Sequence, residues 1–195
     1  MRFTSGFLAL CYGFACWGLL SAMPDIPAHA GDGVLSEVRA GVLAHDVGPF
    51  ADKEEDGVDY NAEVLFLKPK EHVLVPRPHA GFALNSAGDT NRLYGGFTWD
   101  FTSEKRMFLE VGVGAVYHDG VTAPSFSAER EGRKTLGCSV LIRGSLSLGY
   151  NITERHNLSV LVDHMSNAGI CQANEGSDSV GLRYGYRFKP VHLIK

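Results

Sequence analysis

A short region near the C-terminal end of the chain contains a base, a hydroxyl nucleophile and a carboxylate. His164 and Ser166 stand two residues apart, and Asp178 follows a loop rich in turn residues. Alternate side chains of a β-strand project from one face, so His164 and Ser166 are neighbours if this region is a strand. Pairing the strands on either side of the loop with their apolar faces together brings Asp178 to the same side and the same end. The pattern predicts a Ser-His-acid constellation.

A second carboxylate competes for the role of the acid. Glu175 lies in the turn, whereas Asp178 shares the strand parity of Val180 and Leu182. We therefore assign the acid to Asp178 and keep Glu175 as the alternative. The His-x-Ser spacing alone does not decide, because triads are recognised by geometry and not by sequence spacing.

The residues around these positions resemble the PagL-type lipid A 3-O-deacylases, which are outer-membrane acyl hydrolases of Gram-negative bacteria. The resemblance rests on His164-Met-Ser-Asn-Ala-Gly-Ile, on Asn174-x-Gly-x-Asp178 and on the Leu-Arg-Tyr strand that follows. A weaker likeness covers Glu37 to Asp46. The acid is often Glu in that family, so Asp178 is a shorter replacement.

This resemblance implies an eight-stranded barrel that hydrolyses the ester-linked 3-hydroxyacyl chain at the 3-position of lipid A. It assigns Ser166 as the nucleophile, His164 as the general base, Asp178 as the orienting acid and Asn167 as an oxyanion donor. The backbone amides of Ala168 and Gly169 are further candidates for that hole. The alternative interpretation of Asn167 is an ordinary turn residue. We expect no cofactor and no metal site.

Upstream of this hairpin, apolar residues alternate with polar ones in six segments, without a helical run. The apolar stripes cover 38–44, 60–66, 80–84, 93–101, 109–115 and 136–148. Alternation with a period of two predicts strands with one apolar face. With the hairpin they make eight strands, and we predict an all-β, antiparallel barrel.

Charged residues occupy the opposite parity of these strands. They are Glu37, Arg39, Glu63, Glu110, Arg143, Asp163, Arg183 and Arg187. In a membrane barrel the apolar face meets lipid and the polar face lines the interior, while a soluble barrel has the reverse arrangement. We favour a transmembrane barrel whose narrow interior holds a network of paired charges in place of a pore.

The N-terminal region resembles an export signal. Arg2, an apolar stretch from Phe7 to Leu20 and Ala28-His-Ala30 are typical of a secretory signal peptide. We therefore expect residues 1–30 to be a signal peptide and residues 31–195 a single barrel domain in the outer membrane. With both termini inside, the seventh strand ends at the outer surface, and His164 and Ser166 lie near the leaflet that contains lipid A.

Two cysteines remain after the predicted signal peptide, Cys138 and Cys171. In an exported chain they can form a disulfide or stay as two thiols, and the sequence leaves both alternatives open. Their spacing does not indicate a metal site. The formal net charge of −4 gives no basic footprint for nucleic acid. The oligomeric state also stays open, a homodimer included.

Other polar residues receive a structural interpretation. We expect His45 and Asp46 to be structural, and the acidic residues from 52 to 56 to form a solvated loop. A solvated loop is also the expectation for Arg133 and Lys134. We predict a lipid A deacylase; the alternatives are a non-catalytic outer-membrane barrel, such as a structural protein or adhesin, and a soluble ligand-binding barrel of the periplasm.

Overall fold

The computed structural model describes residues 34–50, 52, 55–68, 72–102, 106–125 and 131–188, so the predicted signal peptide lies outside the described residues. These residues form eight strands: β1 Leu35–His45, β2 Val58–Phe66, β3 Arg77–Asn85, β4 Arg92–Thr102, β5 Met107–His118, β6 Val140–Asn151, β7 His156–Ser166 and β8 Ser177–Arg187. In the described part of the chain, no helix is long and apolar enough to cross a membrane.

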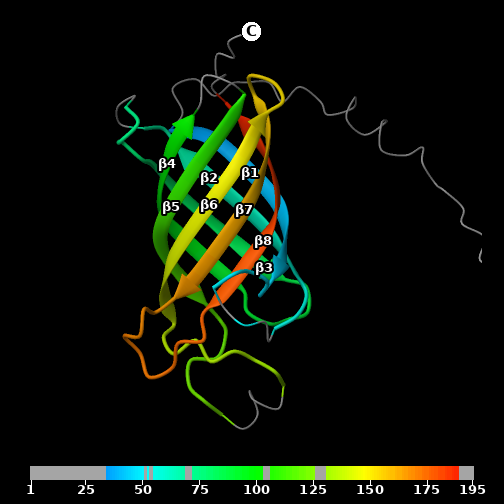
Figure 1. Cartoon of the computed structure of the whole chain (residues 1–195), viewed down its shortest axis with the longest axis vertical. Coiled ribbons are helices and arrows are strands. Elements are labelled where there is room, and N and C mark those ends of the chain that lie inside the picture. The colour runs from blue at the N-terminus through cyan, green and yellow to red at the C-terminus, as the bar shows by residue number, and fades with distance from the viewer. Residues whose placement is uncertain are drawn as a thin grey trace, which may run out of the picture. The chain divides into compact units, whose positions relative to one another are not determined.

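The eight strands close into one antiparallel barrel (Figure 1). Each strand pairs with its neighbour in the chain, and β1 pairs with β8 to complete the wall. Closure leaves no unpaired strand edge, which satisfies the backbone hydrogen bonds of every strand without water. The predicted all-β class, strand number and antiparallel order are confirmed.

The sixth strand starts later than the alternation predicts. β6 begins at Val140, and both Leu136 and Cys138 lie in the loop before it. Leu136 is nevertheless buried, because it packs in a small apolar cluster with Tyr94, Val116, Leu141 and Met165. The apolar pattern begins before the strand itself, because the loop that precedes β6 contributes Leu136 to this interior cluster.

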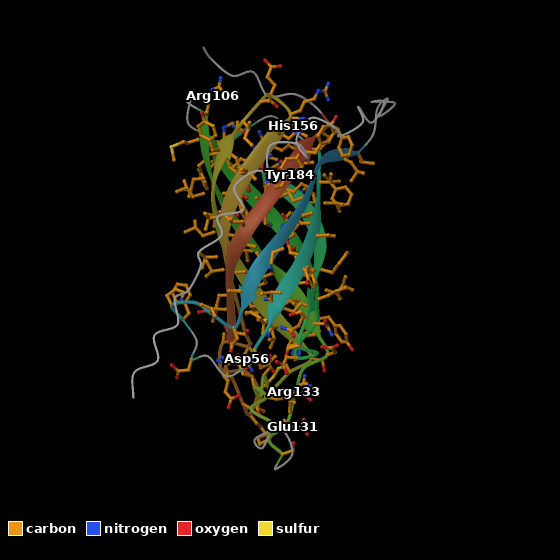
Figure 2. The ribbon with its side chains drawn as sticks, turned by 90° about the vertical axis from the view of Figure 1, so that its right-hand side faces the viewer. Asp56, Arg106, Glu131, Arg133, His156 and Tyr184 are labelled. Carbon is orange, nitrogen blue, oxygen red and sulfur yellow. A yellow bond between two sulfur atoms is a disulfide. The ribbon has the colours of Figure 1, made fainter. Side chains whose placement is uncertain are left out.

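Apolar side chains cover the outside of the barrel, as Figure 2 shows for the side chains that project from the wall. Every strand contributes, and the exposed set includes Val42, Tyr60, Phe82, Leu84, Leu93, Phe97, Val113, Ile142, Leu146, Leu148, Leu158, Val160 and Leu182. An apolar belt of this extent is unfavourable in water and matches the lipid-facing wall of a membrane barrel. The alternative of a soluble barrel does not fit this surface.

The interior is charged and filled. All eight charged positions predicted to face inward are buried. Arg39 contacts Glu37 at 2.7 Å and Glu110 at 2.6 Å, and Arg183 contacts Glu63 at 2.9 Å. Buried charges are tolerated when they are paired and hydrogen-bonded, so these side chains form a polar core of ion pairs in place of a pore.

The two ends of the barrel differ. At one end short connections join β4 to β5 and β6 to β7, and Figure 2 labels Arg106 and His156 there. At the other end lie the connections after β1, β3, β5 and β7, with Asp56 and Arg133 labelled. His164 and Ser166 belong to this loop-rich end, since β7 ends at Ser166.

Candidate active site

Strand register brings the three predicted side chains together. His164 on β7 lies directly opposite Asp178 on β8. The imidazole Nδ1 is 2.7 Å from Asp178 Oδ1, and Nε2 is 3.1 Å from Ser166 Oγ. This is a continuous acid, base and hydroxyl relay, in which the carboxylate fixes the imidazole and leaves Nε2 facing the hydroxyl.

The base of the relay is more exposed than the acid. The His164 side chain is 30% exposed, whereas Asp178 is fully buried. A shielded carboxylate interacts more strongly with the imidazole than a solvated one, because local dielectric screening is weaker. The exposed edge of the pair is the edge that a substrate can approach.

The relay lies on the outer wall of the barrel. Ile142 on β6 is the cross-strand partner of Ser166, and its apolar side chain is 50% exposed. Gly144 is the partner of His164, so no side chain projects from β6 beside the imidazole. The Ser166 hydroxyl therefore lies on the apolar outer wall, beside the exposed side chain of Ile142.

Glu175, the alternative acid, is engaged elsewhere. Its carboxylate accepts a hydrogen bond from the Thr135 backbone N–H, and its own N–H donates to the Thr135 carbonyl at 3.4 Å. These bonds attach the loop before β8 to the long loop between β5 and β6. Of the two carboxylates, Asp178 is the one that contacts His164.

Asn167 supports the loop that follows the hydroxyl. Its side-chain amide donates to the carbonyls of Leu136 at 2.9 Å and Ala173 at 2.5 Å. Both amide hydrogens are therefore used inside the protein. The next residues, Ala168 and Gly169, are exposed and have positive φ angles of 53° and 77°. Their backbone amides follow the hydroxyl at the exposed side of the relay.

A disulfide between Cys138 and Cys171 resolves the question that the sequence left open. The two Cα atoms are 6.0 Å apart, and the bond joins the loop after Ser166 to the segment before β6. Gly137 in that segment has a φ of 84° and lies so close to the Ala173 carbonyl that a side chain would collide with it. The loop next to the hydroxyl is thus fixed on two sides.

Two residues that we expected in solvated loops are buried. Lys134 Nζ lies 2.9 Å from Asp46 Oδ1 and donates to the Gly176 carbonyl at 2.9 Å. The Glu55 carboxylate lies 3.0 Å from His45 Nε2 and accepts from Thr90 at 3.1 Å. The prediction of solvated loops was wrong at these positions. The loops after β1, between β5 and β6 and between β7 and β8 pack on one another and bury their charges as pairs.

The environment of Glu55 favours its ionised form. Burial alone would raise the pKa of this carboxyl group, but hydrogen bonds from His45 and Thr90 outweigh the burial and lower the pKa. His45 and Asp46 are buried, and they contact Asp59 and Lys134. These contacts agree with the expectation that the two residues are structural. Among the described residues, no cluster of three or more His, Cys, Asp or Glu residues is arranged to hold a metal ion.

Comparison with known proteins identifies the family. The family model described as lipid A 3-O-deacylase (PagL) matches residues 57–187, which include the complete relay. The chain belongs to the PagL family. It is 33% identical over 92 residues to the lipid A deacylase PagL of Bordetella bronchiseptica and 29% identical over 89 residues to that of Pseudomonas aeruginosa. These alignments cover 47% and 45% of this chain and 46% and 47% of the relatives, so the chain spans about half the length of the curated relatives it matches.

A solved structure has the same fold. The crystal structure of the outer membrane enzyme PagL superposes with a TM-score of 0.56 at 21% identity, covering 77% of this chain and 99% of that chain. At this identity the match supports the barrel fold of this chain and nothing further.

Proposed function

We propose that the chain is a lipid A 3-O-deacylase of the bacterial outer membrane. In this proposal Ser166, His164 and Asp178 hydrolyse the ester that links a 3-hydroxyacyl chain to the 3-position of lipid A. The observation that carries the proposal is the position of the relay, on the apolar outer wall at the loop-rich end of the barrel. Membership in the PagL family supports it independently.

The relay geometry suits nucleophilic catalysis. His164 Nε2 accepts the Ser166 proton while Oγ attacks the ester carbonyl carbon, and a tetrahedral intermediate forms. The bond between the acyl carbon and the sugar oxygen then breaks. His164 gives its proton to that oxygen, which leaves as the hydroxyl group of the sugar. Asp178 holds the imidazole and stabilises its charged form. Water activated by His164 hydrolyses the acyl-serine and restores the enzyme.

The oxyanion of each intermediate needs hydrogen-bond donors. We assign this role to the backbone amides of Ala168 and Gly169, two exposed residues that lie just after Ser166 and Asn167 in the chain. The Asn167 side chain shapes this turn through its bonds to Leu136 and Ala173 and so acts on the hole through the backbone. A single oxyanion donor contributes roughly 2.7–4 kcal/mol to catalysis in known enzymes.

The wall around Ser166 explains how an enzyme of this kind reaches a lipid. Ile142 and Val140 are exposed on the neighbouring strand, and Ile170 is exposed in the loop after Ser166. Acyl chains can lie against these side chains while the ester stays at the membrane surface, so the lipid need not leave the bilayer. The proposal includes export by residues 1–30 and a single barrel domain over residues 31–195.

Purified protein tests the proposal. Wild-type barrel refolded in detergent is incubated with lipid A, and released 3-hydroxy fatty acid is measured beside the Ser166→Ala variant. We expect release by the wild type and loss of at least about 1,000-fold in the variant. Equal release by both would exclude Ser166 as the nucleophile, and no release by a folded wild type would favour a structural barrel.

A further inference from the structure

A segment near the N-terminal end of the barrel domain, far from Asp178 in sequence, covers the acid of the relay. Residues 47–50, Val47-Gly-Pro-Phe50, follow β1 and are called here the covering segment. The Phe50 backbone N–H donates to Asp178 Oδ2 at 2.6 Å, and the Val47 N–H donates to the Asp178 carbonyl at 3.2 Å. Asp178 thus contacts His164 through one carboxylate oxygen and the covering segment through the other.

The contact is close enough to require glycine. A Cβ atom placed on Gly48 would lie 2.3 Å from Asp178 Cβ and 2.5 Å from Oδ2. Only a residue without a side chain permits the backbone to pass over the carboxylate at this distance. The approach of the covering segment is therefore specified by sequence at Gly48.

Phe50 also touches the base. Its ring lies edge-on to the His164 ring with centroids 5.5 Å apart, and Phe50 is 69% exposed. The residue thus contacts the acid with its backbone and the base with its side chain. An exposed aromatic ring at this position shields one side of the imidazole from water, while its other face stays open to solvent or lipid.

The start of the covering segment is attached to the chain just before Asp178. Asp46, directly before Val47, has a positive φ of 51° and contacts Lys134 at 2.9 Å. The same Lys134 ammonium donates to the carbonyl of Gly176, two residues before Asp178. The covering segment and the acid are thus held by a common buried cation.

We propose that Phe50 is a positioning residue whose backbone N–H holds the Asp178 carboxylate in the orientation that aligns His164 with Ser166. This inference rests on the proposed function and extends it to a loop outside the catalytic hairpin. A hydrogen bond from a backbone N–H to a carboxylate oxygen limits rotation of the carboxylate plane and stabilises its negative charge. Loss of the bond removes one constraint on the carboxylate plane and displaces the imidazole from its alignment with Ser166.

Three variants separate the backbone from the ring. Phe50→Pro removes the N–H, because proline has none. Phe50→Ala removes the ring and keeps the N–H. Replacement of Phe50 by phenyllactate, through an ester linkage, removes the N–H and keeps the ring. Each protein is compared with wild type and Ser166→Ala for kcat and KM on lipid A in detergent, and for thermal unfolding by circular dichroism.

We expect the proline and phenyllactate variants to lose kcat by roughly 10- to 100-fold, the value of one hydrogen bond to a charged group, with KM near that of wild type. Phe50→Ala, which keeps the N–H but removes the ring, is expected to lose less kcat than either of these two variants. Wild-type kcat in the phenyllactate variant would overturn the inference, as would equal loss in all three variants. Activity of the wild type that Ser166→Ala retains would instead contradict the proposed function.

Discussion

Residue identity at the acid position determines how the site is built. Asp178 lies opposite His164 and under the covering segment, while Glu175 is bonded to the backbone of Thr135. The two carboxylates are three positions apart in sequence and serve different purposes, one in the relay and one in loop packing. The parity of β8 distinguishes them, because Asp178 belongs to the outward-facing set and Glu175 precedes the strand.

The first prediction compares these two carboxylates. Asp178→Asn keeps the shape of the side chain but cannot stabilise the imidazolium, so kcat on lipid A should fall by roughly 1,000- to 10,000-fold. Glu175→Gln is the matched control and should stay within about 10-fold of wild type, because its role is to anchor a loop. Steady-state kinetics on the purified barrels measure both. A larger loss in Glu175→Gln would identify Glu175 as the acid.

A second prediction concerns side-chain length. The backbone of Gly48 lies against the Asp178 side chain, which leaves no room for an additional methylene group. Asp178→Glu should therefore displace the imidazole or the covering segment and lower kcat by about 100-fold, the effect of a misplacement of about 1 Å. The kinetic assay above tests it. Wild-type kcat with an unchanged melting temperature would show that the segment yields freely to the longer acid.

The contacts of single residues in loops could not be predicted from sequence. The strand parities predicted which face His164, Ser166 and Asp178 occupy, because alternation is a local property. Phe50 meets Asp178 across 128 positions of sequence, and its contact depends on the path of a loop without regular periodicity. The Gly48-Pro49 pair indicates a turn, but it carries no signal for the partner of that turn.

At the scale of elements, three long loops act as one structure. Lys134 from the β5–β6 loop is buried between Asp46 and the Gly176 carbonyl, and its own N–H donates to Glu55 at 3.2 Å. The disulfide between Cys138 and Cys171 adds a covalent link nearby. In the proposed mechanism these contacts support Ser166 at the end of β7, because the strand alone fixes only one side of the site.

The third prediction removes the buried cation. Lys134→Met leaves the Asp46 carboxylate buried without the ammonium, which should lower the free energy of unfolding of the loop structure by roughly 3–5 kcal/mol. Arg133→Met is the control, since the Arg133 side chain is 23% exposed and lies 3.9 Å from Glu55, and the change should cost less than about 1 kcal/mol. Hydrogen exchange of loop amides measures the effect. Equal protection in both variants would refute the role of Lys134.

Secondary structure was easier to predict than the exact ends of strands. The segments 109–115 and 93–101 alternate cleanly, and both became strands of the barrel. The apolar run from Leu136 did not distinguish a strand from a loop that fills the barrel end, since both place an apolar side chain in a buried site. Lys134 and Glu55 were predicted to be exposed because their side chains are charged. Both are buried, since each has a partner of opposite charge that the sequence pattern does not reveal.

For the whole molecule, the inside and outside of the barrel are inverted relative to a soluble protein. Glu110 and Arg39 form a buried two-point contact at 2.7 and 2.6 Å, while Leu182 on the outer wall is 65% exposed. The sequence predicted both faces by parity, but the choice of the outer face depended on the predicted export signal and the predicted strand number. The interior is filled by paired charges, and the relay of Ser166, His164 and Asp178 lies on the outer face of the same wall.

The fourth prediction tests the lipid-facing wall. Leu182 lies in the middle of β8, and Leu182→Arg should lower the free energy of unfolding in lipid vesicles by roughly 2–4 kcal/mol. Val73, exposed in the β2–β3 connection, is the control, and Val73→Arg should cost less than about 1 kcal/mol. Denaturant titration in lipid vesicles compares them. Equal stability of both variants would place the Leu182 face outside the hydrocarbon region.

The most direct test of the central claim is mass spectrometry of lipid A from cells that express the wild type or Ser166→Ala, matched for folded barrel in the outer membrane. The account predicts that the wild type removes one ester-linked 3-hydroxyacyl chain from the 3-position and that Ser166→Ala leaves lipid A intact. Intact lipid A in both strains, with equal barrel assembly and with lipid A that a known deacylase can cleave, would contradict the account.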